Sequence, residues 1–590
     1  INFYNFHAFF YTLDGLTKHD APPSQFYQNP YWQHFLVLGD YTGRLGYVMS
    51  CGVPIRNIAL LDPTTSLWTQ MGNPFHDFHY IGNNEAEKEK LKRLKQDWSG
   101  ISKQLILHHK DYDHLDPEIL CEAKVTDGKM TIGNASYSVL ILPPITNIET
   151  AAWEKIKLFL EQGGVVIANK QLPYESIEDE LIEQEILDTF GLDQSTRSDY
   201  WKAFQGSYRK GQQNAYFIPS GDTEILLRVL KMHDHEEIHF ETESGKKSFL
   251  TEKRKVSQES TLFFVSNQEE GKHHATLRVS YPCELLKLDL ESGEVEPLAT
   301  SHEETGWQLE LDFDSYQSYL IQITRRDEAG VVKEIAEPWI WKVKSKSNWE
   351  MKALQDNTLR FDQFELGLHP EDNNAVTTRV HVKTFIDQCS DLKNEQNLPV
   401  QFQQLFGTPM KMALNYPISC SYQRKLMVEV MPASCSLLMD KRAISGDYQI
   451  YMNEHRIVDF HPNFVYDNSN LTCDILPYLN EGENILRIEV RVEHDWDGVT
   501  DAIYIAGDFG IAFNEKQEPV LTSAVTTSSL HQGPYTSYPY YAGTLVFTRK
   551  IHIDSAPNEE YFEFVFEDLN KHFHDCMEVL VNGHALGVKA

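Results

Sequence analysis

The segment DYDHLDPEIL, residues 111–120, holds the densest group of side chains that could do chemistry in this chain. Four carboxylates crowd eight of its positions: Asp111, Asp113, Asp116 and Glu118. Neighbouring carboxyl groups can act as a general acid and a general base when one is protonated and the other is ionised. We therefore take Asp113, Asp116 and Glu118 as candidate catalytic residues.

Two histidines, His108 and His109, stand just before this segment and follow the apolar stretch 105–107. If that stretch is a strand, its carboxyl end is where ligand-binding groups collect in an open α/β sheet. We therefore assign His108 and His109 as candidate substrate-binding residues.

The run Asp116-Pro117-Glu118 has a second interpretation, as the start of a helix. Asp is a preferred N-cap, Pro is favoured at the first helical position, and Glu in the first turn is stabilised by the helix dipole. The sequence leaves capping and catalysis open as alternative roles for this run.

The opening stretch INFYNFHAFF alternates between two faces, as a strand would. Tyr4, Phe6, Ala8 and Phe10 form an apolar face, while Phe3, Asn5, His7 and Phe9 form a mixed one. A β/α-barrel strand has this pattern when its outer side packs on helices and its inner side approaches a polar site. We expect residues 1–54 to be the last βα unit of a truncated (β/α)8 barrel whose other units lie upstream.

The end of this expected strand offers further candidates for substrate binding: His7, Tyr11 and Asp14. Trp32 could supply a stacking platform for a sugar ring. Alternative roles stay open, with His7 as an interior histidine, Asp14 as a turn residue before Gly15, and Trp32 as a core indole.

Beyond residue 54, short buried strands alternate with amphipathic helices. The stretch EAEKEKLKRLKQDW places Leu91, Leu94 and Trp98 on one helix face, and Gly163 ends a helix over TAAWEKIKLFLEQGG. This alternation predicts a parallel, doubly wound sheet, so we expect residues 55–240 to form a flavodoxin-like α/β domain.

From residue 241 onward, short alternating strands are separated by turn residues. We expect a β-sandwich over 241–330, a β-rich connecting region over 331–410, and galactose-binding-like jelly-roll domains over 411–515 and 516–590. The last two share an echo, YQIYMNEHRI in the first and MEVLVNGHALG in the second. The second copy stops early, and we expect it to be truncated.

The segment HDWDG, residues 494–498, places Trp496 between two aspartates in the first expected jelly roll. These side chains could bind a sugar or calcium, or the indole could cover the edge between two strands. The sequence favours the covering role.

Composition limits the class of partner. The formal net charge of -33, with no stripe of Lys and Arg between aromatic residues, disfavours nucleic acid. No apolar run approaches the roughly 18 residues of a membrane span. The 28 Tyr, 31 Phe and 10 Trp offer many flat faces that suit sugar rings, although most aromatic side chains are core. A carbohydrate is the expected partner, and the oligomeric state stays undefined.

The eight cysteines lie far apart, with no CxxC pair and no spacing typical of zinc. We expect free thiols, which favour a reducing compartment and therefore a cytoplasmic location. Because we expect the true beginning of the chain to lie upstream, a signal peptide stays an open alternative.

Several segments resemble a known enzyme family. HAFFYTLDG, RLGYVMSCGVPIRNIALLDP, DYDHLDPEIL, VTDGKM and YSVLILPP are similar to the part of glycoside hydrolase family 106, the α-L-rhamnosidases, that follows the barrel. The expected jelly rolls resemble the sugar-binding-type domains of family 2. In family 106, the segment similar to DYDHLDPEIL carries an Asn-acidic pair. Here Asp116 and Pro117 occupy those places, and Glu118 comes one position later.

The resemblance implies an inverting glycosidase that removes terminal rhamnose from plant or microbial glycans, with calcium in or near its site. Inversion requires two carboxyl groups about 6.5–9.5 Å apart, one to protonate the leaving oxygen and one to activate water. In the family, the general acid sits on an earlier barrel strand, so we expect the acid of this protein to lie upstream of residue 1. We therefore expect this chain alone to be weakly active or inactive. Asp20 and Asp40 could donate oxygen ligands to calcium, without the spacing of an EF hand.

Two other functions stay open. A family 2 or β-galactosidase-type hydrolase would carry similar accessory domains, and activity on rhamnosides or galactosides would separate the two enzymes. A non-catalytic carbohydrate-binding protein is the third alternative, which the upstream reading frame would test.

Overall fold

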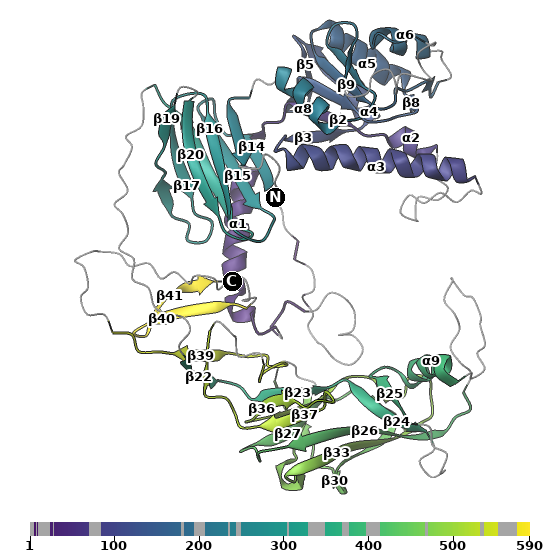
Figure 1. Ribbon diagram of the computed structural model, residues 1–590, viewed down its shortest axis with the longest axis vertical. Helices are drawn as coiled ribbons and strands as arrows, with labels where there is room; N and C mark the ends of the chain where they lie inside the picture. The colour runs from purple at the N-terminus through teal and green to yellow at the C-terminus, as the bar shows by residue number, and fades with distance from the viewer. Residues whose placement is uncertain are drawn as a thin grey trace. The chain divides into compact units, whose positions relative to one another are not determined.

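The described residues of the computed structural model group into two compact units, drawn from residues 40–338 and from residues 5–39 and 339–590 (Figure 1). The structure describes residues 5–6, 9, 24–27, 29–69, 84–178, 182–193, 207–233, 236–242, 249–303, 306–327, 348–368, 377–396, 414–465, 470–530, 536–552 and 575–589. Within these ranges, no helix combines the length and the apolarity that a bilayer crossing requires.

The first unit contains an open sheet with the strand order β11-β12-β9-β7-β2-β3 (Figure 1). The strands are β2 Ile58–Leu61, β3 Tyr112–Leu115, β7 Val139–Leu142, β9 Val165–Asn169, β11 Arg209–Lys210 and β12 Ala215–Ile218. All neighbours pair in parallel except β11, which is antiparallel to β12. Numbered along the chain, the parallel strands lie in the order 2-1-3-4-5, which is the flavodoxin type. The predicted parallel, doubly wound sheet is present.

Separate apolar cores cover the two faces of this sheet, because parallel strands are buried on both sides. One core includes α4 Pro117–Cys121, α5 Thr150–Glu161 and α6 Glu183–Thr189, and the other includes α3 Glu85–Leu107 and α8 Thr223–Met232. Trp153 and Phe159 anchor α5 and are fully buried. As predicted, α5 gives way to a left-handed residue, Gly163, with φ of 96°.

The apolar stretch 105–107 ends a helix and does not form a strand, contrary to the expectation from the sequence. The helix α3 runs without a break to Leu107, and Leu105 is fully buried on the face that also carries Trp98 and Ile101. The strand β3 begins only at Tyr112. Three apolar residues fit either structure locally, and here the spacing of the preceding helix continues through them.

A first β-sandwich accompanies the α/β domain; its strands β13 to β21 lie within residues 238–325, where the sequence predicts a sandwich over 241–330. Its antiparallel sheets have the orders β1-β14-β15-β21-β17-β18 and β13-β16-β20-β19. The strands are β1 Val53–Pro54, β13 Ile238–Thr242, β14 Phe249–Lys255, β15 Ser260–Asn267, β16 His273–Val279, β17 Cys283–Leu288, β18 Val295–Pro297, β19 Ser301–Glu303, β20 Gly306–Phe313 and β21 Ser318–Arg325. Both sheets contribute to one core. The edge strand β1 comes from before the α/β domain, so the two domains are interleaved in the chain.

The helix of the βα unit expected over residues 1–54 is present, as α1 Phe35–Ser50. Its second half packs on the first sandwich, where Leu45 and Met49 are buried with Leu290 and Leu320. Gly52 has φ of 65°, and a Cβ there would lie 2.3 Å from the carbonyl oxygen of Lys255. Glycine is therefore required where the chain turns from α1 into β1.

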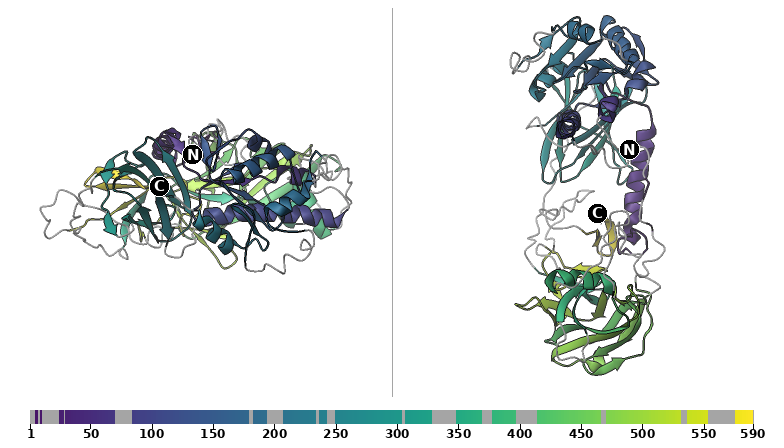
Figure 2. Two further views of the ribbon diagram at one scale, coloured as in Figure 1. Left: turned by 90° about the horizontal axis from the view of Figure 1, so that it is seen from above. Right: turned by 90° about the vertical axis from the view of Figure 1, so that its right-hand side faces the viewer.

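The second unit contains a second β-sandwich, green in Figures 1 and 2. One sheet has the order β23-β35-β27-β32-β31, and the other contains β25-β24-β26-β33-β29-β30 with β37 and β36 added at β26. The strands are β23 Asn357–Phe361, β24 Gln363–Leu368, β25 Thr377–His381, β26 Ile418–Val428, β27 Cys435–Asp440, β29 Asp447–Met452, β30 His455–Ile457, β31 His461–Pro462, β32 Asn470–Asp474, β33 Gly482–Val492, β35 Ile503–Gly507, β36 Gly510–Phe513 and β37 Pro519–Thr522. Residues of both sheets form one core.

The boundaries of this sandwich differ from the predicted 411–515. The strands β23, β24 and β25 come from the predicted connecting region and pair within the two sheets. The strand β37 comes from the predicted second jelly roll and pairs in parallel with β26. Strand pairing joins residues remote in sequence, so the local pattern could not place these boundaries. The jelly-roll topology stays a prediction.

The internal echo noted in the sequence is a pair of similar hairpins. In YQIYMNEHRI, β29 turns at Asn453 into β30, and in MEVLVNGHALG, β40 Met577–Val581 turns at Asn582 into β41 His584–Lys589. Both asparagines have positive φ, 55° and 52°. Asn tolerates the left-handed conformation of a tight hairpin turn, which explains why the two stretches look alike. In the same unit, a separate small sheet forms where β22 Trp349–Ala353 pairs with β38 Thr527–Ser528 and β39 Leu545–Thr548.

The predicted barrel strand lies mostly outside the described residues. Of residues 1–10, the structure describes Asn5, Phe6 and Phe9, and none of these three belongs to a strand. The barrel therefore stays a prediction.

The eight cysteines are free thiols, as predicted. Burial raises the pKa of the Cys283, Cys389, Cys420 and Cys435 thiols to about 12. These four side chains therefore behave as small apolar core residues.

Candidate functional site

The carboxyl edge of the parallel sheet gathers polar side chains from three successive loops. β2, β3 and β7 end next to one another, and β2 lies between the other two because the strand order reverses there. Ligands bind open α/β sheets at such a switch point, outside the carboxyl ends of the strands. We call the polar residues at this point the carboxyl-edge cluster: Asp62, Thr64, Thr65, Ser66, His114, Asp116, Asn147 and Glu149.

Hydrogen bonds link these loops in pairs. His114 Nδ1 and Asp62 Oδ1 lie 2.8 Å apart, and the Thr64 hydroxyl donates to Asp116 Oδ2 at 3.0 Å. These contacts join the loops after β2 and β3. The loop after β7 is joined to the first by Ser66, whose hydroxyl donates to the side-chain oxygen of Asn147 at 2.9 Å. The cluster therefore consists of separate hydrogen-bonded pairs that together join the three loops.

Glu149 is the member of the cluster whose side chain is satisfied least. Its Oε1 accepts from the Thr65 hydroxyl at 2.5 Å, while its Oε2 is buried without a hydrogen-bond partner. Glu149 is also the N-cap residue of α5 but makes no side-chain capping bond. It borders a narrow hollow that Asp62, Thr65 and Ser66 also line. Glu149 Oε2 is therefore an unsatisfied acceptor below the surface of the carboxyl edge.

The first turn of α5 has a different partner for its free backbone groups. The backbone N–H and the hydroxyl of Thr150 both donate to Glu178 Oε2 at 2.9 Å. The backbone hydrogen bond is the main reason that the pKa of Glu178 is lowered. Because Glu178 serves the helix end, Glu149 is left to face the carboxyl-edge cluster.

Asp116 caps α4, as one of the two interpretations of the sequence predicted. Its Oδ1 accepts from the backbone N–H of Glu118 at 2.9 Å, and Pro117 occupies the first turn. Glu118 lies on the exposed side of the same turn. The segment therefore places one carboxylate in a structural role and presents the next one to solvent, at the carboxyl edge of the sheet.

Replacing Asp116 with alanine is expected to lower the free energy of unfolding by about 0.5–2 kcal/mol, because α4 loses its cap. Urea denaturation would measure the change. Asp116→Asn keeps an acceptor oxygen, so its free energy of unfolding should fall by less than that of Asp116→Ala. Equal midpoints for wild type and Asp116→Ala would contradict the capping role.

Asp113, predicted as catalytic, is held between two donors. Arg56 Nη1 lies 2.6 Å from its Oδ1, and the Tyr137 hydroxyl donates to its Oδ2 at 2.9 Å. Arg56 also forms an ion pair with Glu252 of β14. Burial and the Asp113 carboxylate together raise the pKa of Tyr137, which therefore stays a donor. Asp113 thus links the parallel sheet to the first sandwich.

Asp111 forms a second link to the first sandwich, which we call the Lys253 cluster: Asp111, Glu236, Thr251 and Lys253. Lys253 Nζ lies 2.7 Å from Glu236 Oε2 and 3.5 Å from Asp111 Oδ2. The Thr251 hydroxyl donates to Asp111 Oδ1 at 2.6 Å. Burial raises the pKa of Asp111 despite the nearby ammonium group. Burial would lower the pKa of Lys253, but Asp111 and Glu236 outweigh it and raise that pKa.

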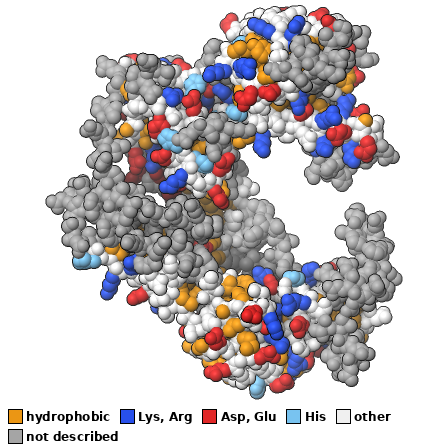
Figure 3. All heavy atoms as spheres, viewed as in Figure 1, with side chains coloured by type: hydrophobic (Ala, Val, Ile, Leu, Met, Phe, Trp, Pro, Cys, Tyr) orange, Lys and Arg blue, Asp and Glu red, His pale blue; other side chains and the backbone are white. Residues whose placement is uncertain are grey.

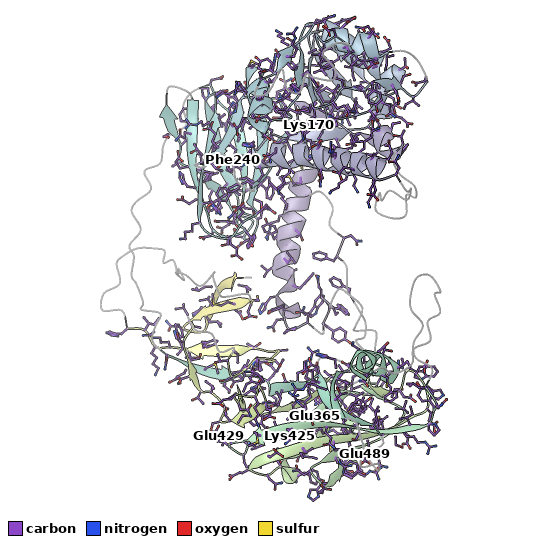
Figure 4. All side chains as sticks on the ribbon, turned by 45° about the vertical axis from the view of Figure 1, so that its right-hand side comes forward. Lys170, Phe240, Glu365, Lys425, Glu429 and Glu489 are labelled. Atoms are coloured by element: carbon purple, nitrogen blue, oxygen red, sulfur yellow. The ribbon has the colours of Figure 1, made fainter. Side chains whose placement is uncertain are left out.

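The predicted substrate-binding residues His108 and His109 lie at the opposite end of β3 from Glu118, because they precede the strand. His108 is the C-cap residue of α3. The ring of His109 meets that of Phe240 edge-on, with centroids 5.1 Å apart, and Figure 4 labels Phe240 on the first sandwich. The structure does not bring these histidines to the carboxyl-edge cluster. The reason is that residues 105–107 end the helix α3 and do not form a strand. The two histidines therefore precede β3 and do not follow a strand.

The other predicted substrate-binding residues belong to the amino-terminal stretch. His7, Tyr11 and Asp14 lie outside the described residues. Trp32 is 37% exposed and stacks on Phe35, with ring centroids 5.4 Å apart. Its ring also meets Phe9 and Phe26 edge-on. Trp32 therefore packs in an aromatic cluster while part of its side chain stays exposed. It is neither a fully buried core indole nor a fully exposed stacking platform.

The calcium that the family resemblance implies stays a prediction. The described residues contain no group of three or more His, Cys, Asp or Glu side chains arranged to hold a metal ion. Asp40 lies 3.9 Å from Arg44 in an exposed ion pair, and Asp20 lies outside the described residues.

Sequence reasoning missed Asp62 and Glu149. Both follow buried strands, in LLDP and in LILPPITNIE, and the end of a parallel strand was the signal used for residues 108–118. The same rule applied to every strand would have found them. Lys170, labelled in Figure 4, is a further polar residue at this edge, after β9, where it forms an ion pair with Asp97 of α3.

The surface of the described residues carries charges of both signs. On the face drawn in Figure 3, Lys and Arg side chains of the described residues are interspersed with Asp and Glu side chains.

The described residues thus define a multidomain, sheet-rich protein with a flavodoxin-type sheet and two β-sandwiches. No known protein family and no curated protein matches the chain. Among solved structures, the chain is similar to a rhamnosidase from Novosphingobium sp. PP1Y, at 13% identity and a TM-score of 0.36 over 81% of this chain and 42% of that chain. It is also similar to a β-galactosidase from Bacillus circulans sp. alkalophilus, at 12% identity and a TM-score of 0.33 over 49% of this chain and 44% of that one.

A third similar structure is α-L-fucosidase isoenzyme 2 from Paenibacillus thiaminolyticus, at 11% identity and a TM-score of 0.29 over 47% of this chain and 49% of that one. The matched part spans less than half the length of each of these three proteins. At these scores the likenesses define neither the fold nor the activity of this chain.

Proposed function

We propose that this chain is the part of a glycoside hydrolase that follows its catalytic barrel, and that the whole enzyme releases terminal α-L-rhamnose with inversion. Its substrate would be a rhamnoside of a plant or microbial glycan. The general acid would belong to the upstream barrel, and this chain would contribute the carboxyl edge of its parallel sheet.

One observation carries the proposal. Most of the described residues that resemble family 106 fall on elements of the flavodoxin-type domain: β2, β3 with α4, β4 Lys124–Thr126 with β5 Lys129–Ile132, and β6 Ala135–Tyr137 with β7. The remainder, the end of α1 with β1, leads into this domain from the first sandwich. A resemblance scattered over unrelated loops would carry little weight. Here it follows the path of the chain through a flavodoxin-type domain and meets the carboxylate-rich switch point.

Within this proposal, Glu118 is the best candidate for the base that activates water. Asp113 is bonded to Arg56 and Tyr137, and Asp116 caps a helix, so neither carboxylate is free to accept a proton from water. Glu118 is exposed beside them. An inverting enzyme would place it about 6.5–9.5 Å from the acid, leaving room for the water molecule.

The test is to express this chain together with its upstream reading frame and to assay 4-nitrophenyl glycosides. We expect hydrolysis of the α-L-rhamnoside, and proton NMR of the first product should show the β anomer. Hydrolysis of the β-D-galactoside alone would favour the β-galactosidase alternative instead. An upstream frame with no barrel, or a protein that hydrolyses neither glycoside, would overturn the proposal and favour a carbohydrate-binding protein.

A further inference from the structure

The segment HDWDG forms a rigid loop after β33 because a buried carboxylate holds it. Asp497 is 3% exposed, and its Oδ2 accepts from the backbone N–H groups of Glu493 and His494 at 2.8 and 2.9 Å. Its Oδ1 accepts from the Ser445 hydroxyl at 3.0 Å. A buried, fully bonded carboxylate fixes the backbone on either side of it, so the loop has one defined shape.

The next residue fixes the loop from the other side. Gly498 has φ of 114°, and a Cβ there would lie 2.8 Å from the Tyr422 hydroxyl. The carbonyl oxygen of Asp497 accepts from the backbone N–H of Phe385, at the start of α9 Phe385–Gln396, at 2.7 Å. The loop is therefore anchored to the core of the second sandwich and to a helix.

This rigid loop presents an aromatic surface to solvent. The Trp496 side chain is 60% exposed, and its ring stacks on the imidazole of His494 with centroids 4.7 Å apart and planes 10° apart. His494 Nδ1 lies 3.5 Å from the buried Asp497, which holds the imidazole in place. Because His494 covers one side of the indole, the exposed area lies on the other side. An indole that covered a strand edge would be far more buried, so the structure does not support the role that the sequence favoured.

Polar groups lie beside this aromatic surface. Asp495, between the two rings in sequence, is exposed, and its Oδ1 accepts from the Tyr416 hydroxyl at 2.6 Å. Its backbone carbonyl accepts from Ile386 of α9, which fixes its position. A flat apolar face next to an oriented carboxylate matches the two sides of a pyranose, which carries C–H groups on one face and hydroxyls at its rim.

We propose that His494, Asp495 and Trp496 form a binding site for a neutral pyranose unit of a glycan. The sugar ring stacks on the exposed face of Trp496, and a ring hydroxyl donates to Asp495. The site belongs to the second sandwich and requires no catalytic group, so it is independent of the proposed hydrolase activity.

Saturation-transfer-difference NMR on the whole chain tests this site with methyl α-L-rhamnopyranoside and methyl β-D-galactopyranoside. We expect a saturable signal from the ring C–H protons of at least one glycoside, and none from sorbitol, which has no ring. Loss of one aromatic stacking contact corresponds to about tenfold weaker binding, so Trp496→Ala should raise the dissociation constant by about that factor. Trp496→Phe should keep part of the affinity.

Trp68 provides a matched control, because it is also 60% exposed but ends α2 Thr64–Trp68 in the α/β domain. Trp68→Ala should bind the glycoside as the wild type does. Equal binding by wild type and Trp496→Ala, or no saturable signal from either glycoside, would overturn the proposal. Unfolding curves of Trp496→Ala and Trp68→Ala would show that both variants are folded. Because the assay uses this chain without the upstream barrel, its outcome does not depend on hydrolysis.

Discussion

Replacing Lys253 with methionine is expected to lower the free energy of unfolding of the first unit by about 3–5 kcal/mol. The Lys253 side chain is 8% exposed, and those of its partners Asp111 and Glu236 are 9% and 13% exposed. Methionine fills a similar volume but leaves two carboxylates with no cation. Asp111 Oδ2 already has no hydrogen-bond partner, so its charge would depend on Thr251 alone. The change in urea midpoint at constant m-value would measure the loss.

The same variant should depend on pH in a defined direction. Burial already raises the pKa of Asp111, so the folded protein binds its proton more readily than the unfolded chain does. Stability from this group is then highest below the unfolded pKa of about 3.9 and falls as the pH rises through the folded value. Removing the ammonium group raises that folded value further. The deficit of Lys253→Met relative to wild type should therefore shrink as the pH falls toward 4.

The wild type should show the complementary effect at high pH. The pKa of Lys253 is raised by its two carboxylates, so its contribution is complete below the ordinary lysine value of about 10.4 and is lost as the pH rises through the folded value. Lys253→Met has no ammonium group at this position, so it should not show this loss of stability at high pH.

Two variants control for other causes. Lys255 lies on the same strand and is exposed, so Lys255→Met should change the unfolding free energy by less than about 0.5 kcal/mol. The triple variant Asp111→Asn, Glu236→Gln, Lys253→Met removes every charge of the cluster and should recover much of the stability. A Lys253→Met protein as stable as wild type at neutral pH would show that the Lys253 cluster is not essential to the contact between the parallel sheet and the first sandwich.

Elements with a strong local pattern could be predicted from the sequence. The strand β2 is buried at every position, and α5 alternates its apolar residues at helical spacing before Gly163. Buried parallel strands separated by such helices leave little choice of architecture, because each face of the sheet must be covered. The flavodoxin-type domain followed from these features without any knowledge of distant contacts.

The role of DYDHLDPEIL could be predicted only in part, because its side chains point to two different places. Asp116 and Glu118 reach the carboxyl edge, where a local helix-start signal identified the cap. Asp113 instead meets Arg56, 57 residues away, and Asp111 meets Thr251, 140 residues away. Charge alone does not tell a structural carboxylate from a catalytic one when its partner is remote in sequence.

The boundary errors in the second unit have the same physical origin. β24 pairs with β26 across an insertion that includes α9, and β37 returns to pair with the last two residues of β26, Met427 and Val428. Strands are stabilised by neighbours across the sheet, so their assignment to a domain depends on contacts that no short window contains. Hairpins are the exception, because both strands and the turn are contiguous, and both echoed hairpins were visible in the sequence.

Replacing Glu118 with glutamine in the barrel-containing enzyme is expected to lower kcat by about 10²–10⁴-fold, with a smaller change in KM. Glutamine keeps the size and the hydrogen-bonding edge of the side chain but cannot accept a proton from water. The loss should be equally large on rhamnosides with good and with poor leaving groups, because an inverting base acts on the water and not on the leaving oxygen. Steady-state kinetics on 4-nitrophenyl α-L-rhamnoside and on a rhamnosyl disaccharide would measure both values.

Glu122 offers the matched control, since it is an exposed glutamate at the other end of the same short helix. Glu122→Gln should keep the wild-type kcat and KM. Asp113→Asn should act differently from both, because it weakens the bonds to Arg56 and Tyr137 and should therefore lower thermal stability more than the rate measured well below the midpoint. A Glu118→Gln enzyme within threefold of the parent would remove Glu118 from the mechanism. The base would then be sought first at Glu149, whose Oε2 is buried without a partner at the same edge of the sheet.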